Sequence, residues 1–506
     1  MASTAIPAPS ATAADQAAQL KHGELSLFDS VMIATASVAP AYSLEATIGL
    51  LVVAVGLASP ATILVSFVPV LFIALAYYYM NRQDPNCGAS YSWLARTVNP
   101  FVGWFNGWIQ TAASVLFCIA APVLAGTNTM ALLQSLGWVS KDVAGNTAVV
   151  AVVSLLWLIL VTVMVARGIR MTANFQWVMV AIEYILVLGF SIAAFLKIAA
   201  SHPAGSRGVD LNWLNPFTIQ GLGGLAAGAV LGVFFFWGWD TAANLNEETK
   251  DGADAPGIAG IMSMFILLFV FLVASVAMQA LIPSDVIGKQ VGNALFYFAE
   301  QVAPAPISYL MVLAVLASTV ATTQTTLLPA TRLTFSMARD KVFPAPFGHV
   351  HPVWQTPWIG TIIVGTISAI GILLTSFSSS VNSTFQTMIS NIGVLVALYY
   401  GLTGLACAWA FRKMLTQTPI FLFLAGILPA LGGLFLLWIA YQVVAQAGFG
   451  ASLPVLIVVV AGIPLVILAR VLTPSDFFGT KSVAYTRENT ARATTSTAEV
   501  APTPAG

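Results

Sequence analysis

The chain has 506 residues, of which 58% are hydrophobic and only 8% are charged. A soluble protein does not need so much apolar sequence at so low a charge density, so the composition predicts a polytopic membrane protein. The formal net charge is zero, which gives no reason to expect a nucleic-acid partner. The three cysteines lie far apart and the four histidines fall in polar segments, so we expect no disulfide framework, metal site or cofactor.

The two ends of the chain differ in composition from its middle. Residues 1–24 begin with a stretch rich in Ala, Pro, Ser and Thr that lacks the apolar core of a signal peptide. Residues 474–506 have a similar composition. We expect both segments to be disordered tails, because neither holds enough apolar sequence to form a core.

Twelve apolar segments lie between the tails, and a helix needs about 20 residues to cross a bilayer. We expect the spans at residues 27–56, 60–81, 100–131, 147–166, 173–197, 221–246, 257–281, 306–338, 358–376, 384–410, 419–443 and 453–472. The predicted fold class is an all-α polytopic membrane protein with twelve transmembrane helices.

The distribution of basic residues supports this arrangement. With twelve spans, fifteen of the nineteen Lys and Arg residues fall on one side of the membrane. The other side holds Lys141, Lys197, Arg207 and Lys289. Because basic residues concentrate on the cytoplasmic side, we expect both termini to be cytoplasmic. The expected location is the plasma (inner) membrane.

The first span is interrupted by Pro40, within the run Ser-Val-Ala-Pro-Ala-Tyr-Ser at residues 37–43. Proline removes a backbone donor and disfavours helical geometry in the residue before it. The segment is therefore either a break between two half-helices or a simple proline kink.

The sixth span is interrupted as well. Its apolar part, residues 221–236, covers only about half of a bilayer, and residues 241–246 are short and polar. Between them lies Trp-Gly-Trp-Asp at residues 237–240. Backbone that leaves a helix at this depth must line a cavity or be buried in protein. In transporters, interrupted helices of this kind hold the substrate.

Spans one and six each begin a group of five spans. Since five is an odd number, the second group must run in the opposite direction, which indicates an inverted repeat with the site at its interface. We expect the two repeats at residues 25–200 and 215–411. Spans eleven and twelve, within residues 415–473, lie outside the repeat.

Four short motifs carry a resemblance to a known family. They are, in chain order, Pro-x-x-Gly-x-x-Tyr-x-Trp at residues 85–93, Arg-Gly at 167–168, Phe-Phe-Trp-Gly-Trp-Asp at 235–240 with Glu-Glu at 247–248, and Ala-Thr-Arg-Leu at 330–333 with Ala-Arg-Asp-Lys at 338–341. Over about residues 25–410 the chain therefore resembles permeases of the amino acid–polyamine–organocation (APC) superfamily. The resemblance implies a 5+5 inverted repeat, interrupted helices one and six, and transport of an amino acid or amine instead of enzyme activity.

One departure from the family pattern bears on the substrate. Many APC members have Gly-Ser-Gly at the first break, where bare amides hold the substrate carboxylate. This chain has Ala39-Pro40-Ala41 there instead. The departure puts in question whether the substrate is an ordinary amino acid.

The predicted substrate site lies at the two breaks. Freed N–H groups at the start of a half-helix attract an anion, and freed carbonyls at the end of another attract an ammonium group. Aromatic side chains beside the breaks offer a lid or a cation–π surface. The expected substrate-binding residues are Ser37, Ala39, Pro40, Ala41, Tyr42, Ser43, Phe236, Trp237, Gly238, Trp239 and Asp240.

Three acidic residues, Glu45, Glu183 and Asp240, lie deep within the predicted spans, and no basic residue lies deep in one. A charge at the bilayer centre costs about 2.5–3.5 kcal/mol, so each of them needs a partner, a proton or a function. By the resemblance, Glu183 lies where some proton-coupled APC members have a fifth-span lysine near the first break. We interpret Glu183 as the coupling residue, and the alternative is a structural carboxylate bound to a neighbouring helix.

The other two acidic residues each have two interpretations. Glu45 follows the first break by about one turn, as a second candidate for coupling. It either faces the outer approach to the site, where it would favour cations, or extends to the outer surface. Asp240 either contacts the substrate or, as we favour, caps the second half-helix by accepting backbone N–H bonds.

The eighth span is rich in hydroxyl groups. In sodium-coupled relatives, hydroxyls on this span join first-span carbonyls around sodium, which makes Ser318, Thr322 and Thr323 a candidate cation site. The alternative is that they line contacts between helices. Residues 285–302 have an amphipathic pattern that resembles the outer half-helix that closes over the site in this fold.

Three classes of function follow from the sequence. The first is a secondary active transporter that moves amino acids or related amines across the bilayer by alternating access, with a proton, or else sodium, as the coupling ion. The second is a polyamine or organocation carrier, or an amino acid exchanger. A channel or membrane enzyme is a remote alternative, because the spans contain neither a repeated filter nor a nucleophile–base pair.

Overall fold

The computed structural model describes residues 19–375, 381–473 and 475–486, and no side chains at 381–386 or 449–451. Most of the two predicted tails lies outside these ranges. In these ranges the regular elements are all helices. The described residues form no strand, and their β-type pairing is limited to an isolated bridge between Leu25 and Thr249. The prediction of an all-α fold is confirmed.

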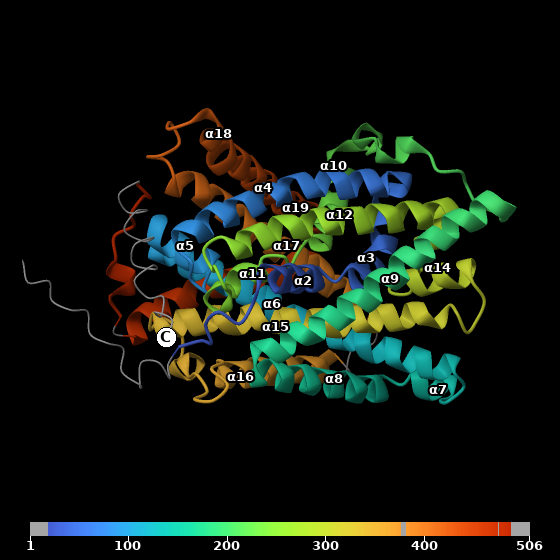
Figure 1. The fold of residues 1–506 in the computed structure, drawn as a ribbon, viewed down its shortest axis with the longest axis horizontal. Helices are drawn as coiled ribbons and strands as arrows, with labels where there is room; N and C mark the ends of the chain where they lie inside the picture. Colours follow the sequence, from blue (N-terminus) through green and yellow to red (C-terminus); the bar gives the residue numbers. More distant parts are fainter. Residues whose placement is uncertain (1–18, 376–380, 474, 487–506) are drawn as a thin grey trace, which may run out of the picture.

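The bundle is built from longer helices, several of which run side by side along one direction of the molecule (Figure 1). They are α2 (Leu27–Val38), α3 (Pro40–Val55), α4 (Ser59–Gln83), α6 (Pro100–Ser135), α8 (Thr147–Arg167), α9 (Ile169–Ser201), α10 (Gly221–Phe235), α12 (Ala255–Leu281), α15 (Tyr309–Arg339), α16 (Trp358–Thr375), α17 (Val381–Ala410) and α19 (Leu428–Leu472). Shorter helices connect or extend them: α5 (Ser90–Thr97), α7 (Lys141–Ala144), α11 (Thr241–Asn244), α13 (Ser284–Ile287), α14 (Ala294–Val302) and α18 (Pro419–Phe421).

Ten helical segments of the described chain are long and apolar enough to cross a membrane. The first of them, Leu27–Gln83, takes in α2, α3 and α4. Helix α10 is apolar but has only 15 residues, and α19 is interrupted at Gly448, whose φ of 77° is not helical. The structure is therefore that of a multi-pass membrane protein, and the number of twelve spans stays a prediction.

Local sequence explains where several helices begin. Helix α2 begins with a capping box, in which Ser26 and Asp29 each bond the other's backbone N–H. Helix α6 begins at Pro100, after Asn99 accepts a bond from Phe101 N. Asn146 caps α8 in the same way. These caps satisfy N–H groups that helix geometry leaves free.

Bonds between distant segments show which helix ends lie together. At one end, which we call the α5 end, Lys250 N donates to Leu25 O and Thr356 Oγ1 donates to Ala166 O. At the opposite end, which we call the α14 end, Lys197 Nζ donates to Gln301 O. The side of the membrane that each end faces stays a prediction, as do the repeat boundaries.

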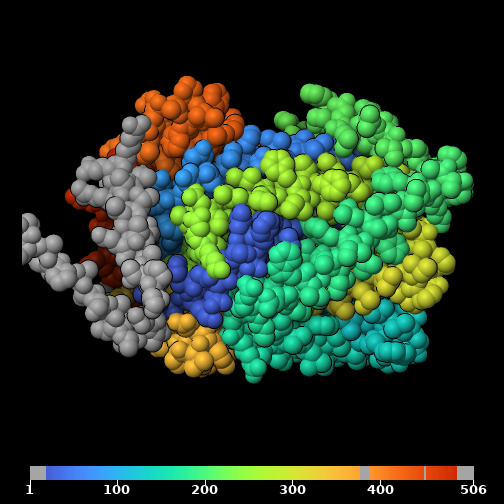
Figure 2. All heavy atoms as spheres, in the orientation of Figure 1, coloured from blue at the N-terminus to red at the C-terminus, as the bar shows by residue number. Residues whose placement is uncertain are grey.

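The outer surface of the bundle is apolar. Large side chains on α8, α9, α16 and α19 are between 62% and 74% exposed, namely Leu156, Ile185, Leu196, Leu374 and Val471. Figure 2 shows one face, where α2 in dark blue lies between α12 in yellow-green and α9 in green. An apolar surface of this kind fits contact with lipid.

The interior is built around α15, which packs on α6, α9 and α2. From Ser318 to Met337 its residues are buried without exception. Helix α10 in turn packs on α3, α4 and α17. Most residues of the two interrupted spans are therefore buried between helices.

Candidate substrate site at the two helix breaks

The first span is broken at Ala39. Helix α2 ends at Val38, Ala39 is left-handed with φ 52° and ψ 73°, and α3 begins at Pro40. The left-handed backbone conformation is energetically unfavourable for alanine, as for any residue other than glycine. Proline fits the first position of a helix, because the N–H that it lacks would have had no partner there. The segment is thus a break between two half-helices and more than a proline kink.

The sixth span is broken opposite the first. Helix α10 ends at Phe235 and α11 begins at Thr241. Gly238 has φ +121°, and a Cβ on it would lie 2.6 Å from Ser37 O. The Ser37 and Thr241 hydroxyls are 2.8 Å apart. The two breaks therefore pack directly on each other, and only glycine allows this approach.

Glu183 of α9 lies at the first break. Its Oε1 accepts bonds from Ala41 N at 2.6 Å and from Ser318 Oγ at 2.7 Å. Tyr42 N donates to the same Ser318 Oγ at 3.0 Å. Glu183 is fully buried, and its Oε2 has no hydrogen-bond partner in the described part of the chain. The structure places Glu183 where the resemblance implied, next to the break.

The amides of the first break are consequently occupied. Pro40 has no N–H, the Ala41 N–H is bound by a carboxylate, and the Tyr42 N–H is bound by a hydroxyl. Ser43 Oγ adds a bond across the break, to Val38 O at 2.7 Å. Protein groups therefore bind the N–H groups that, in the Gly-Ser-Gly pattern of other APC members, would hold a substrate carboxylate.

Asp240 does not cap the second half-helix, so that interpretation is wrong. No side-chain cap bond is formed at the start of α11. The carboxylate instead accepts from Tyr400 OH at 2.9 Å, from Tyr399 OH at 3.0 Å and from Gln110 Nε2 at 3.4 Å. Helices α17 and α6 supply these donors, which turn the carboxylate away from the α11 backbone.

Four aromatic rings form a cluster beside the breaks. Tyr42 lies 5.2 Å from Phe117, and Phe117 lies 5.3 Å from Trp237. Phe234 completes the group at 6.3 Å from both Phe117 and Trp237. All four side chains are at most 7% exposed. We call Tyr42, Phe117, Phe234 and Trp237 the aromatic cluster.

Two of the predicted aromatic residues lie elsewhere. Phe236 packs on Phe67 and Phe271, with ring centres 5.6 Å and 5.4 Å away. Trp239 packs on Tyr77 at 5.0 Å. Both are buried between helices, so they support the second break and do not belong to the aromatic cluster.

Glu45 is fully buried, so its interpretation as a residue that extends to the surface is wrong. Its Oε2 accepts a bond from Leu295 N at 2.6 Å, and its backbone O accepts from Gly292 N at 3.2 Å. Leu295 is in the first turn of α14, where N–H groups are free and attract an anion. Glu45 therefore ties α3 to the start of α14.

The three hydroxyls of the candidate cation site have different partners. Thr322 Oγ1 donates to Ser37 O at 2.7 Å, which joins span eight to a carbonyl of the first break. Thr323 Oγ1 donates to Thr319 O of its own helix. Ser318 is bound to Glu183 and Tyr42. Of the three, only Thr322 thus contacts a first-span carbonyl.

Sequence reasoning missed five residues of this region: Gln110, Phe117, Phe234, Tyr399 and Tyr400. Trp237 Nε1 donates to Tyr399 OH at 2.6 Å, so the tyrosine pair connects the aromatic cluster to Asp240. Adjacent tyrosines in the middle of span ten were a usable signal, because a hydroxyl at that depth needs a partner. Phe117 gave no signal among the other apolar residues of α6.

Acidic residues at the α5 end are arranged differently from those at the breaks. Glu248 and Arg332 are both fully buried and form two bonds of 3.0 Å. Glu247 binds Arg339 at 2.8 Å. Burial opposes ionisation of Glu247, but the bonds and charge of Arg339 outweigh it and hold the pKa of this carboxyl below its usual value.

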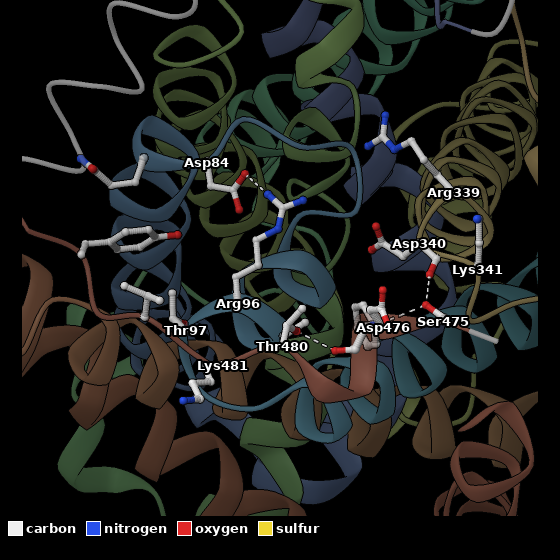
Figure 3. A pocket seen from close by; sticks show the side chains of 15 residues that line it. Asp84, Arg96, Thr97, Arg339, Asp340, Lys341, Ser475, Asp476, Thr480 and Lys481 are labelled. Carbon is white, nitrogen blue, oxygen red and sulfur yellow. Dashed lines mark hydrogen bonds and ion pairs between the residues drawn. The ribbon is translucent and has the colours of Figure 1, made fainter. Parts of the chain in front are cut away.

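A cavity of about 670 Å³ opens at the α5 end. Asp84, Arg96, Asp340 and Lys341 line it together with the segment after residue 474, as Figure 3 shows. Asp84 and Arg96 form an ion pair there. Burial raises the pKa of Asp84 above its usual value, and Arg96 offsets only part of this effect.

Comparison with known proteins assigns the fold to a family. The profile of the amino acid permease family matches residues 25–468, which includes both breaks and α15. The chain belongs to the amino acid permease family. It is thus a transporter of the APC superfamily, as the four motifs implied, and not an enzyme.

Three relatives illustrate the range of this family. The permease is 27% identical over 375 residues to the low-affinity putrescine importer PlaP of Escherichia coli (strain K12), with 70% of this chain and 74% of the relative covered. It is 25% identical over 327 residues to the methylthioribose transporter of Bacillus subtilis (strain 168), with 62% and 67% covered. It is 25% identical over 386 residues to the branched-chain amino acid permease BcaP of Lactococcus lactis subsp. cremoris (strain MG1363), with 72% and 78% covered.

Proposed function

We propose that this permease is a secondary active transporter that moves amino acids or related amines by alternating access, and that Glu183 couples transport to protons. The observation that carries the proposal is the place of Glu183. It lies fully buried at the first break, with one oxygen bound to Ala41 N–H and Ser318 and the other without a partner among the described residues. The proposed location is the plasma membrane with both termini in the cytoplasm.

Burial of the site supports alternating access. Every side chain of the aromatic cluster, and also Glu183 and Asp240, is buried, at no more than 7% exposed. A substrate can enter or leave only if the helices around the breaks move. Gly238 and Ser37 bring the two interrupted spans into direct contact. Motion of one span at this point would therefore move the other.

The bonding of Glu183 supports a role in coupling. A charge at the centre of a bilayer costs about 2.5–3.5 kcal/mol, so a carboxylate that has only neutral donors gains from binding a proton. Its Oε1 is held by two donors, while its Oε2 is free to carry that proton. Because Ala41 belongs to α3, a change in the charge of Glu183 acts directly on the geometry of the first break.

The experiment is uptake into proteoliposomes under an imposed inward proton gradient without sodium. The solutes are neutral, acidic and basic amino acids and putrescine, and the proteins are wild type and Glu183→Gln. We expect gradient-stimulated uptake of at least one solute by wild type. In Glu183→Gln this stimulation should vanish while solute exchange persists, because the amide retains the bond to Ala41 N–H but cannot take up the proton.

Two results would contradict this assignment. Wild-type uptake that is indifferent to the proton gradient would exclude proton coupling and direct attention to sodium, with Thr322 and Ser37 O as the contacts to test. Unchanged gradient stimulation in Glu183→Gln would leave coupling to protons intact but exclude Glu183 as its site.

A further inference from the structure

The N–H groups at the start of α3 form a position that could bind an anion, and side chains of this protein occupy it. The start of α3 offers two N–H groups, because Pro40 has none. Glu183 Oε1 binds the first, from Ala41, at 2.6 Å, and Ser318 Oγ binds the second, from Tyr42, at 3.0 Å. Ser318 also donates to Glu183, so the two groups form one closed unit. No backbone donor is left at this helix start for a carboxylate from outside.

We propose that Glu183 takes the place of a substrate carboxylate, and that the permease therefore selects organic amines that lack an α-carboxylate. In this role Glu183 is a specificity-determining residue. The inference rests on the proposed function only in so far as the substrate is bound at the two breaks. It needs neither coupling to protons nor a direction of transport.

The charges around the breaks agree with a cationic substrate. Glu45, Glu183 and Asp240 are buried, and the ion pairs of the described chain involve none of them. Arg332 is the one buried basic side chain in the described ranges, and Glu248 binds it. A second carboxylate brought next to Glu183 would meet a like charge in a region of low dielectric constant. An ammonium group would meet the opposite charge.

The aromatic cluster offers a surface for the same kind of molecule. Tyr42 is the residue after Ala41, whose N–H is bound by Glu183. Trp237 is linked to Asp240 by hydrogen bonds through the Tyr399 hydroxyl. The four rings thus extend from the neighbourhood of one unpaired carboxylate to that of the other. Ring faces attract ammonium groups, and their apolar area fits methylene or aryl carbons. A primary amine or diamine matches this arrangement better than a zwitterion does.

Matched pairs of solutes test the proposal directly. Each pair consists of an amino acid and the amine that lacks only its carboxylate: ornithine and putrescine, lysine and cadaverine, tyrosine and tyramine, leucine and 3-methylbutylamine. Binding of each compound to the purified full chain in detergent is measured by isothermal titration calorimetry. We expect an amine of at least one pair to bind, with its amino acid at least tenfold weaker, which corresponds to about 1.4 kcal/mol.

Two variants of Glu183 separate its shape from its charge. Glu183→Ala frees the Ala41 N–H, so the amino acid of the responsive pair should gain at least tenfold in affinity relative to wild type. Glu183→Gln is the matched control, because its side-chain carbonyl can still accept the Ala41 N–H and keep a carboxylate out. We therefore expect Glu183→Gln to gain far less amino acid binding than Glu183→Ala, with only the effect of removing the like charge.

The proposal is overturned if wild type binds the amino acid of each pair as tightly as the amine, or binds no amine. It is also overturned if Glu183→Ala elutes as a folded monodisperse protein and gains no amino acid binding. If that variant does not fold, the comparison of pairs on wild type still decides. Because calorimetry needs no gradient, failure of proton-driven uptake alone would contradict the proposed coupling and leave the amine preference standing.

Discussion

Two pairs of carboxylates in this permease differ in their partners. At the α5 end, Glu248 and Glu247 are each bound to an arginine. At the helix breaks, Glu183 and Asp240 accept bonds only from neutral amides and hydroxyls in the described chain. An arginine fixes the charge of a carboxylate, because a guanidinium stays protonated. A carboxylate with neutral donors remains free to bind a proton or a cation, which is the property on which the role proposed for Glu183 depends.

The largest effect is expected at the fully buried pair of the α5 end. Arg332→Ala leaves Glu248 charged, buried and without its partner, which should lower the free energy of unfolding by about 3–5 kcal/mol. Unfolding in mixed micelles of sodium dodecyl sulfate measures this loss. A matched neutralisation at the breaks, Glu183→Gln, removes a charge that has no basic partner and should cost far less. Equal losses in the two variants would remove the distinction between the groups.

The contact between the breaks should be the next most sensitive feature. Gly238→Ala places a Cβ 2.6 Å from Ser37 O at a φ of +121°, so we expect a loss of about 2–4 kcal/mol in stability and loss of transport. Gly189→Ala in α9 is the control, because its added Cβ meets no atom within 4 Å apart from the neighbouring backbone of its own helix. Near-wild-type uptake by Gly238→Ala would show that the breaks do not need their close contact.

A smaller effect is expected from the hydroxyl that holds Glu183. Ser318→Ala removes a donor to Glu183 and the acceptor of Tyr42 N–H, which should cost about 1.5–3 kcal/mol in stability and reduce gradient-driven uptake. Thr323→Ala removes a bond within α15 itself and should change either quantity little. If both variants behave alike, Ser318 has only the ordinary role of a helix hydroxyl.

The smallest effect is expected at the partly exposed pair of the α5 end. Arg339→Ala should cost about 1 kcal/mol or less, because Arg339 is 39% exposed and its pair with Glu247 is screened. Since Arg339 lowers the pKa of Glu247 in the folded state, the pair stabilises the fold fully above the unfolded pKa and loses this contribution as the pH falls through the folded one. The cost should therefore be equal at pH 6 and pH 8. If the loss of stability in Arg339→Ala differs between pH 6 and pH 8, the pKa of Glu247 is not lowered by Arg339 in the folded state.

The fold followed from the sequence where the signal was local. Apolar runs of sufficient length predicted the helices, and Pro40 and Gly238 predicted the two breaks because each has backbone properties that no other residue supplies. Glu183 could be placed beside the first break because the resemblance gave its position relative to Arg167-Gly168.

The partners of the acidic residues could not be predicted in the same way. Asp240 looked like a helix cap because its sequence neighbours are the start of a half-helix, whereas its donors, Tyr399 and Tyr400, lie 159 and 160 positions away. For Glu45 the sequence left open whether it faces the outer approach to the site or extends to the surface, whereas it is buried and bound to Leu295 N of α14, 250 positions away. Contacts over such separations depend on how the helices pack, which no short pattern in the sequence contains.

The most direct test of the account is a structure of Glu183→Ala with ornithine bound. If Glu183 stands in for a substrate carboxylate, one carboxylate oxygen of ornithine will lie about 2.7–3.2 Å from Ala41 N, where Glu183 Oε1 lies in wild type. If the ornithine carboxylate lies away from Ala41 while the Ala41 N–H is bound by another protein group, the first break is not an anion position, and Glu183 does not stand in for a substrate carboxylate.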